Sequence, residues 1–309
     1  MNSNKRKARG RDVHGILLVD KPAGITSNDT LQIVKRMYDA NKAGHTGSLD
    51  RPATGMLPIC LGEATKFTSY LLNADKHYRA RCQLGAVTTT GDADGEVTNH
   101  QPVPASLTAA DINRVLEDFK GDIQQVPPMH SALKHKGQRL YKLAYQGIEV
   151  EREARQVTIY SARLLDYTNE QFEIEVHCSK GTYIRTLAED IGKRIGCGAH
   201  ILSLVRTAVG PFKQGMLTQD ELARLAYMGR SALDGVLLPI DAVIQDLPEI
   251  MLSGAVSRYI EQGQAVMVPS APREGMLRIY NENHHFLGVG EVLDDGRIAP
   301  RRLVNTQQA

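Results

Sequence analysis

The chain has 309 residues and a formal net charge of +2, from 37 lysines and arginines against 35 aspartates and glutamates. This length suggests about two domains, and hydrophobic and charged fractions of 42% and 23% exclude wholesale disorder. The near-neutral charge does not by itself predict a nucleic-acid partner, because such predictions need an excess or a cluster of charge.

The cysteines and the apolar runs indicate where the protein works. None of Cys60, Cys82, Cys178 and Cys197 lies in a Cys-x-x-Cys motif, so we expect reduced, mostly buried thiols. The apolar run at 16–19 is too short for a signal-peptide core. No stretch reaches the ~20 apolar residues of a membrane span. We therefore predict a cytoplasmic protein without a membrane partner.

The N-terminal region alternates between charged, apolar and glycine-rich segments. Residues 1–11 carry five basic residues and no acid, which predicts a basic arm, although a solvated tail is the commoner meaning of such a run. A strand is expected at 16–19, then a turn, then a helix capped by Thr26 or Ser27. Residues 44–55 contain three glycines and a proline, which preclude a regular helix or strand and predict a functional loop.

The middle of the chain mixes short strands and helices. Strands are expected at 76–84, 157–160 and 172–176, a polar loop at 85–95, and helices at 108–119, at 182–194 and after the capping box at 218–221. These elements lack the regular rhythm of a parallel βαβ sheet. We predict an α+β fold with a mixed, largely antiparallel sheet and flanking helices.

The C-terminal region has a different texture. A boundary is expected near Leu247-Pro248, because short strand-like runs and turns follow it. The expected organisation is a basic arm at 1–11, a main domain at 12–247 and a small β-rich domain at 248–309.

Motif searches leave one candidate for chemistry. The sequence has no metal-binding, dinucleotide, P-loop or serine-hydrolase motif. Asp50 remains as a nucleophile or base in the glycine-rich loop, although an isolated Asp in such a loop is usually a turn or cap residue. Tyr183 and Arg185 follow Gly181 at a strand-to-helix junction, and an arginine beside a carboxylate would keep it ionised.

Several separated motifs resemble the TruB family, the stand-alone tRNA pseudouridine-55 synthases. In chain order they are Val19-Asp20-Lys21-Pro22-x-Gly24, Gly44-His45-Thr46-Gly47-x-Leu49-Asp50, Ala53-Thr54-Gly55, Leu61-Gly62-Glu63-Ala64-Thr65-Lys66, Tyr78, Gly91-Asp92-Ala93-Asp94-Gly95, Pro127-Pro128-x-x-Ser131-Ala132-Leu133, Cys178-Ser179-Lys180-Gly181-Thr182-Tyr183-Ile184-Arg185, Gly196-Cys197-Gly198-Ala199-His200, Leu204-x-Arg206 and Gly296-Arg297-x-Ala299-Pro300-Arg301-Arg302-Leu303. The resemblance covers nearly the whole chain, so it extends to the fold as well as to one site.

The resemblance implies isomerisation of a uridine in the T-loop of tRNA, with no cofactor and no metal. It implies that Asp50 is the catalytic carboxylate and that Arg185 pairs with it. Tyr78 would stack on the target uracil, while Tyr183 and Leu204 would line its pocket. His45 would lie near the flipped-out nucleotides. Base flipping costs a few kcal/mol, and stacking on an aromatic side chain returns about 1–3 kcal/mol.

The resemblance also implies how the RNA is held. The acid-free, basic stretch 123–148 matches an insertion, at about 123–155, that grips the T-arm through phosphate contacts. Its presence indicates an enzyme that needs no guide RNA or protein partner, and a monomer is the default expectation. The last part of the chain resembles a PUA-type RNA-binding domain, with Arg297, Arg301 and Arg302 as candidate phosphate contacts.

The sequence departs from the family pattern in three places. Arg51-Pro52 stands where Pro-Leu is usual, which puts a new charge beside Asp50. Thr89 replaces an aspartate in the segment 88–90, and His130 replaces an aromatic residue. None of these changes removes an expected catalytic residue, so we expect an active enzyme.

Two other functions stay open on the sequence alone. A tRNA-folding chaperone would explain the basic arm, the basic insertion and the PUA-like domain without catalysis. A metal-dependent nuclease would need clustered acids or histidines, which the sequence does not show.

Overall fold

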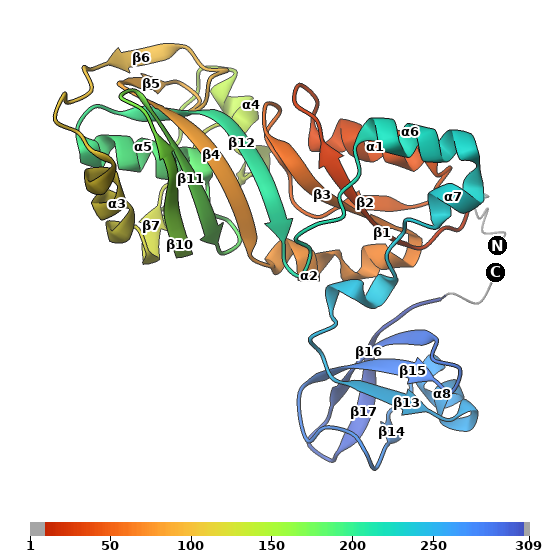
Figure 1. Cartoon of the computed structure of the whole chain (residues 1–309). Coiled ribbons are helices and arrows are strands. Elements are labelled where there is room, and N and C mark those ends of the chain that lie inside the picture. Colours follow the sequence, from red (N-terminus) through yellow and green to blue (C-terminus); the bar gives the residue numbers. More distant parts are fainter. Residues whose placement is uncertain (1–9, 306–309) are drawn as a thin grey trace.

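The computed structural model describes residues 10–305 (Figure 1). Residues 1–9 of the predicted basic arm therefore lie outside the described residues. Arg11, at the end of that predicted arm, forms an ion pair with Asp234 and a β-bridge with Ala40. Position 11 thus belongs to the folded part of the chain.

The main sheet confirms the predicted α+β class. Within residues 10–305 it has eight strands, in the order β1-β3-β12-β4-β11-β10-β7 with β2 also paired to β3. Every pairing in it is antiparallel except that of β12 with β3. The strands are β1 Gly15–Lys21, β2 Ala43–His45, β3 Thr54–Leu61, β4 Lys76–Leu84, β7 Gly121–Gln125, β10 Arg155–Tyr167, β11 Gln171–Cys178 and β12 Ala199–Val209.

Three helices begin where cap residues predict a start. Thr26, Thr108 and Thr218 each form a capping box at the N-terminus of a helix, satisfying backbone N–H groups that the helix leaves free. The helices are α1 Ser27–Met37, α2 Thr68–Asn73, α3 Ala109–Asp118, α4 Leu140–Ala144, α5 Ile184–Ile195, α6 Gln219–Met228, α7 Arg230–Asp234 and α8 Gly254–Glu261, with 3-10 turns η1 Gly62–Phe67 and η2 Ile240–Val243.

The two halves of the main sheet are covered differently. On β1, Ile16 and Leu18 pack with η1, α2 and η2, whereas Leu17 and Val19 pack with α1, α6 and α7. Burial on both faces explains why β1 is a continuous apolar run. At the other half, α3 and α5 pack on β4, β10, β11 and β12.

Two central strands were not predicted. β3 begins at Thr54, inside the stretch expected to be irregular, and β2 also enters that stretch at Gly44. The irregular part is therefore the shorter segment 46–53. β12 lies between β3 and β4, so it joins the two halves of the sheet.

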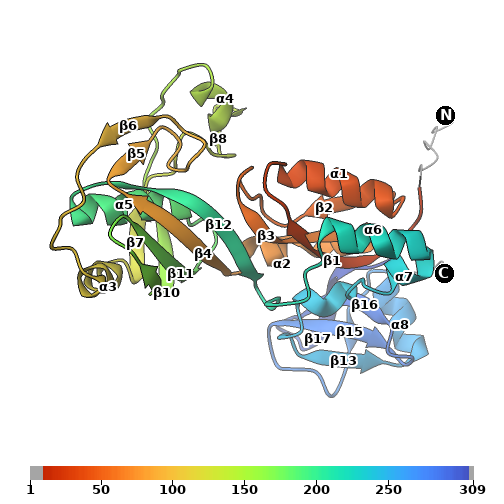
Figure 2. The ribbon, with the colours of Figure 1, turned by 45° about the horizontal axis from the view of Figure 1, so that its top comes forward.

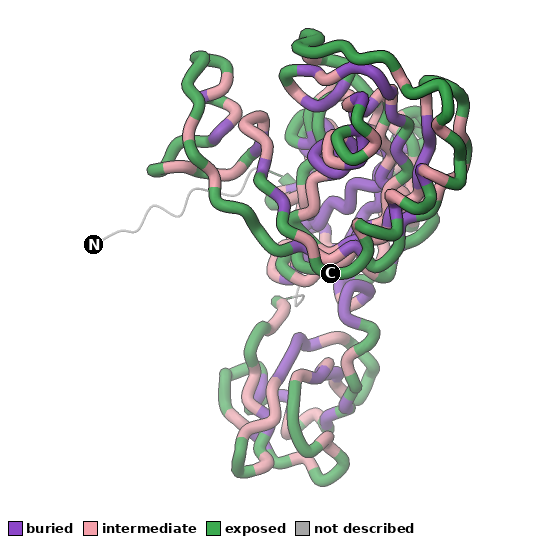
Figure 3. Tube along the Cα trace, turned by 90° about the vertical axis from the view of Figure 1, so that its left-hand side faces the viewer, coloured by how far each residue is buried: buried purple, intermediate pink, exposed green. Residues whose placement is uncertain are grey.

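The C-terminal part forms its own sheet, in the order β13-β15-β16-β17-β14. Its elements are β13 Glu249–Leu252, β14 Val266–Met267, β15 Met276–Asn281, β16 Phe286–Val292 and β17 Arg297–Leu303, with α8 packed against them. Figure 3 shows this part beside the larger one, with buried residues inside each. Phe286 contacts Phe67 of η1 (ring centroids 5.7 Å apart), and Tyr280 donates a hydrogen bond to Asp241 of η2 (2.5 Å), which joins the parts.

The segment between β7 and β10 has little regular structure. It contains a two-residue hairpin, β8 Lys134–His135 and β9 Gln138–Arg139, followed by α4. Figure 2 shows β8 and α4 projecting from the body of the molecule. A second small hairpin, β5 Ala86–Thr88 and β6 Val97–His100, occupies part of the predicted 85–95 loop. Across residues 10–305, no helix combines the length and apolar character that a membrane crossing requires.

Candidate active site

Asp50 lies in the loop of residues 46–53 between β2 and β3, which we call the catalytic loop after the role that the resemblance implies for Asp50. At its start, the Thr46 N–H donates to the carbonyl of Pro58 on β3 (3.1 Å). Ser27, at the start of α1, donates from Oγ to the Leu49 carbonyl and accepts from the Leu49 N–H (3.2 and 2.8 Å). The residue before Asp50 is therefore fixed to α1 on both sides of its backbone.

Two buried cations hold three more carbonyls of the catalytic loop. Arg206, on β12, donates to the carbonyl of Gly47 (3.1 Å) and approaches that of Ser48 (3.5 Å). Lys21, at the end of β1, donates to the carbonyl of Arg51 (3.2 Å). The Asp50 carbonyl accepts from the Ala53 N–H (3.2 Å). Every carbonyl from position 47 to 51 thus has a donor, so the backbone that carries Asp50 is preorganised.

Gly55 allows β12 to approach the catalytic loop. It has φ +97°, and a Cβ there would lie 2.3 Å from the backbone oxygen of Arg206. Its N–H donates to the carboxylate of Asp20 (3.1 Å). Only glycine adopts this conformation without strain at so short a distance from a neighbouring strand.

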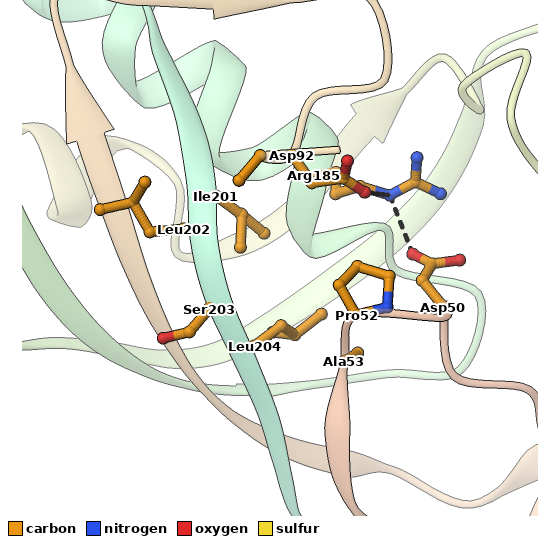
Figure 4. Close-up of a pocket in the computed structure, with 10 residues that line it drawn as sticks. Asp50, Pro52, Ala53, Asp92, Arg185, Ile201, Leu202, Ser203 and Leu204 are labelled. Atoms are coloured by element: carbon orange, nitrogen blue, oxygen red, sulfur yellow. Dashed lines mark ion pairs between the residues drawn. The ribbon is translucent and has the colours of Figure 1, made fainter. Parts of the chain in front are cut away.

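The predicted pair of Asp50 and Arg185 is present. The Arg185 Nε lies 2.9 Å from Asp50 Oδ2, and Figure 4 shows this ion pair together with a longer one to Asp92 (3.8 Å). The Arg185 side chain is 6% exposed and that of Asp50 is 44% exposed, so a substrate can reach the carboxylate while the arginine stays buried.

The electrostatics of Asp50 reflect a balance. Burial in the cleft raises the pKa of its carboxyl above the ordinary value, and the charge of Arg185 opposes that rise. Asp92 adds to the rise, and Lys21 opposes it. Arg185 is therefore the main group that favours the ionised form a nucleophile or base requires.

Arg185 also ties three segments together. Its Nη1 donates to the carbonyl of Thr90 and its Nη2 to the carbonyl of His130, both at 2.7 Å. Both bonds use main-chain oxygens, so they do not depend on which side chain occupies position 90 or 130. The His130 ring instead packs edge-on to Tyr145, with centroids 5.7 Å apart.

The other departures also have structural accounts. Thr89 accepts a hydrogen bond from the Glu96 N–H (3.2 Å), so a short polar side chain is satisfied there. Arg51 donates from Nε to the Gly24 carbonyl (2.8 Å). The new positive charge thus serves the turn after β1, and the groups that shift the pKa of Asp50 are others.

A pocket opens beside Asp50 and brings part of the predicted site together. It is lined by Asp50, Pro52, Ala53, Asp92, Ala93, Arg185, Ile201, Leu202, Ser203 and Leu204. In Figure 4, Leu204 of β12 points toward Pro52 and Asp50, whereas Leu202 points away from them. Leu204 therefore lines the same pocket as the ion pair.

The predicted aromatic residues and His45 lie outside that lining. Burial raises the pKa values of Tyr78 on β4 and Tyr183 at the start of α5, and the Asp50 carboxylate raises both further, so both tyrosines lie within its electrostatic range. His45 ends β2, and its buried Nδ1 has no hydrogen-bond partner among residues 10–305. Burial lowers the pKa of His45, which favours the neutral ring.

Sequence reasoning gave no role to the two buried cations. Lys21 is fully buried and Arg206 is 1% exposed, and both lie in motifs that carry the resemblance. Burial lowers the pKa of Lys21 to about 8. A lysine or arginine inside an otherwise apolar strand was the available signal, because burying such a charge is costly unless it is well bonded. Within residues 10–305, no group of three or more His, Cys, Asp or Glu side chains could hold a metal ion.

Three sequence families match successive parts of the chain. Residues 35–184 match the TruB family pseudouridylate synthase N-terminal domain. Residues 185–245 match the tRNA pseudouridylate synthase B C-terminal domain, and residues 248–304 match the pseudouridine synthase II TruB C-terminal family.

Relatives of known name match over nearly their whole length. A tRNA pseudouridine synthase B of Nitrosococcus oceani is 54% identical over 304 residues, covering 98% of each chain. The protein of that name from Coxiella burnetii strain Dugway 5J108-111 is 52% identical over 309 residues, again covering 98% of each. That from Serratia proteamaculans is 50% identical over 310 residues, covering 97% of this chain and 98% of its own.

Solved structures share the fold at lower identity. A chain of a Cbf5-Nop10-Gar1 complex has a TM-score of 0.72 and 24% identity, covering 94% of this chain and 84% of its own. A chain of an H/ACA RNP bound to a substrate RNA containing 2'-deoxyuridine also has a TM-score of 0.72, with 21% identity and coverage of 98% and 92%.

Proposed function

Because the chain belongs to the TruB family of pseudouridylate synthases, we propose that it converts uridine 55 in the T-loop of tRNA to pseudouridine. It is a tRNA pseudouridine synthase and therefore an isomerase. In the proposed reaction the C1′–N1 bond breaks, the uracil turns, and C5 bonds to C1′. The proton leaves C5 and N1 gains one, so substrate and product have the same composition.

The Asp50–Arg185 pair at the pocket is the observation that carries the proposal. A carboxylate that attacks a carbon or removes a ribose proton must be ionised and reachable. Asp50 is 44% exposed and lies 2.9 Å from a buried guanidinium nitrogen, which meets both needs. We propose Asp50 as the essential carboxylate on either route and Arg185 as its partner.

The other site residues are assigned by the same proposal. Tyr78 stacks on the target uracil, and Tyr183 and Leu204 form the walls of its pocket. His45 stays neutral and uses its unpartnered Nδ1 toward the displaced nucleotides. Taking a base out of its stack costs a few kcal/mol, which these contacts repay in part.

The mode of RNA binding forms a further part of the proposal. The insertion at 123–155 has exposed basic side chains at Lys134, Lys136 and Arg139 beside Tyr145, which is 80% exposed. We propose that it grips the T-arm and that a single chain in the cytoplasm acts without a guide RNA, a protein partner or a cofactor. The domain at 248–309 serves as a PUA-like RNA-binding unit in this proposal.

The test is to incubate the protein with an unmodified tRNA transcript and to map pseudouridine by position. We expect modification at position 55 with wild type and none with Asp50→Asn. Asp50→Asn should still bind tRNA, since phosphate contacts supply most of the affinity. The proposal fails if wild type modifies no T-loop uridine or if Asp50→Asn modifies as much as wild type.

A tRNA-folding role can coexist with catalysis. The exposed basic insertion favours it, because such a surface can hold RNA whether or not Asp50 reacts. Rescue of tRNA folding by Asp50→Asn in cells that lack the protein would support this second role. If the tRNA folds correctly only with the active enzyme, the second role is contradicted.

A further inference from the structure

We propose that Arg206 is a positioning residue that sets Asp50 against Arg185; this rests on the proposed function. Its guanidinium contacts the catalytic loop near its start and also contacts β3, the strand that follows the loop. Nη2 donates to the Gly47 carbonyl (3.1 Å), and Nε donates to the Met56 carbonyl on β3 (2.7 Å). One planar guanidinium thereby connects the start of the loop to the strand that follows it.

The backbone of Arg206 adds a second link to β3, just after the catalytic loop. Arg206 pairs with Gly55 in the parallel contact between β12 and β3, and the missing Cβ of Gly55 is what permits that approach. Backbone and side chain of one residue therefore contact the chain on both sides of Asp50 in the sequence. Asp50 lies between the two gripped segments in the sequence.

The charge of Arg206 argues for more than structural support. It is 1% exposed, and among residues 10–305 it pairs with no carboxylate. Burying an unpaired guanidinium is expensive, and a neutral donor would satisfy a carbonyl at lower cost. Its charge acts at the site, where it adds to the lowering of the pKa of His45 that burial causes and opposes the rise in the pKa of Tyr78 that burial causes.

The geometry separates Arg206 from lysine. A guanidinium has donors in a planar fork that can serve carbonyls on two segments, whereas an ammonium is a single point of charge. Arg206→Lys would keep the charge and lose the fork. We expect Asp50 to drift from Arg185 in that variant, since an error of 1 Å at reacting groups can cost about 100-fold in rate.

Lys76 provides a matched control. It is also a buried cation, on the neighbouring strand β4, and it donates to the backbone carbonyls of Leu71, Leu72 and Ala74. Within residues 10–305 it forms no hydrogen bond or ion pair with the catalytic loop, and it has no part in the proposed reaction. Lys76→Met should therefore lower Tm while leaving the rate per folded molecule within about threefold of wild type.

The experiment compares Arg206→Lys, Arg206→Gln and Lys76→Met by single-turnover pseudouridine formation, Kd for tRNA and Tm. We expect both Arg206 variants to react about 100-fold more slowly with Kd within about threefold of wild type. The acid limb of the Arg206→Lys rate profile should move up by about one pH unit, because Asp50 loses the arginine that favours its ionised form. A merely structural role would lower Tm without that shift.

The outcomes are separable. A wild type that forms no pseudouridine defeats the proposed function and this inference together. An active wild type with Arg206→Lys within threefold of its rate overturns this inference alone. A loss of activity that comes from weaker tRNA binding also overturns it. So does a loss of rate that Lys76→Met shows equally when its Tm falls as far. Should Arg206→Gln fail to fold, Arg206→Lys carries the test by itself.

Discussion

The catalytic loop and the insertion differ in how far their structure is fixed by internal contacts. In the catalytic loop, each carbonyl from 47 to 51 has a hydrogen-bond donor, and two of the donors are buried cations. In the insertion, the hairpin strands have two residues each, α4 has five, and Tyr145 is 80% exposed. Chemistry needs fixed positions, whereas gripping a large RNA needs exposed, adaptable side chains.

Arg185→Lys should have the largest effect, because Arg185 serves both regions. The variant loses the Asp50 pair or the bonds to Thr90 and His130, since a lysine cannot make all three contacts. We expect pseudouridine formation to fall about 1000-fold and the free energy of unfolding to fall by about 2–3 kcal/mol. Single-turnover assays and urea titration measure these two quantities. An activity within tenfold of wild type would contradict the conclusion that Arg185 supports both regions.

Gly55→Ala should break the catalytic loop without touching an ionisable group. A Cβ at 2.3 Å from the Arg206 oxygen must push β3 and β12 apart, and φ +97° strains any other residue. We expect about a 100-fold loss of rate with tRNA affinity preserved. Gly137→Ala, in the β8–β9 hairpin of the insertion, is the matched control. It also has positive φ, but its Cβ would meet nothing within 4 Å, so its rate should change by less than about threefold.

The pH dependence of the rate should depend on Asp50 in the catalytic loop and not on the insertion. Only ionised Asp50 reacts in the proposed mechanism, so the single-turnover rate should fall about tenfold per pH unit below its pKa. That pKa lies above the ordinary aspartate value because of burial. The folded chain then binds this proton more readily than the unfolded chain. As pH falls through that range, activity is lost, whereas the contribution of Asp50 to stability increases. An acid limb centred below the ordinary value, about 3.9, would contradict this.

Removing charge from the insertion should affect binding alone. In a Lys134→Ala, Lys136→Ala, Arg139→Ala variant we expect Kd for tRNA to rise about tenfold and the maximal rate to stay within about twofold. The slope of log Kd against log salt should decrease by up to about three. A triple variant with an unchanged salt slope would show that these side chains do not contact phosphate.

The smallest expected effect distinguishes arginines of the C-terminal sheet. Arg297 and Arg301 pair with Asp295 and Glu291, whereas Arg302 has no ion pair among the described residues. Arg302→Ala should therefore weaken tRNA binding about two- to threefold, and Arg301→Ala less. Filter binding at low salt measures both. The reverse order would show that the existing ion pairs are exchanged for phosphate.

Sequence patterns predicted the parts of the fold that have local signals. The sequence predicted a cap at Thr26 or Ser27, a helix from 108 and a capping box at 218–221, and in the structure a helix begins after each of Thr26, Thr108 and Thr218. β3 escaped because it is buried on both faces and follows directly on the glycine-rich loop, so neither alternation nor a turn marks its start. β12 escaped because its pairing joins segments far apart in the sequence.

The site divides in the same way. The resemblance paired Asp50 with Arg185, and the ion pair is present. Spacing could not show that Arg206 and Lys21 bond to the loop that carries Asp50, because those bonds span up to 159 positions. Their buried charge was visible only as an exception to an apolar pattern. The roles of Tyr78, Tyr183 and His45 stay predictions until a bound RNA tests them.

The four buried thiols can serve as probes of opening in the main domain. Cys60 on β3, Cys82 on β4, Cys178 on β11 and Cys197 after α5 are all buried, and burial raises the pKa values of Cys60 and Cys178 to about 12. A thiol alkylator reacts with thiolate, so modification requires transient opening of the fold. No cysteine follows position 197 in the sequence. The rate of alkylation therefore measures how often the region around the main sheet opens, and it gives no signal from the C-terminal sheet.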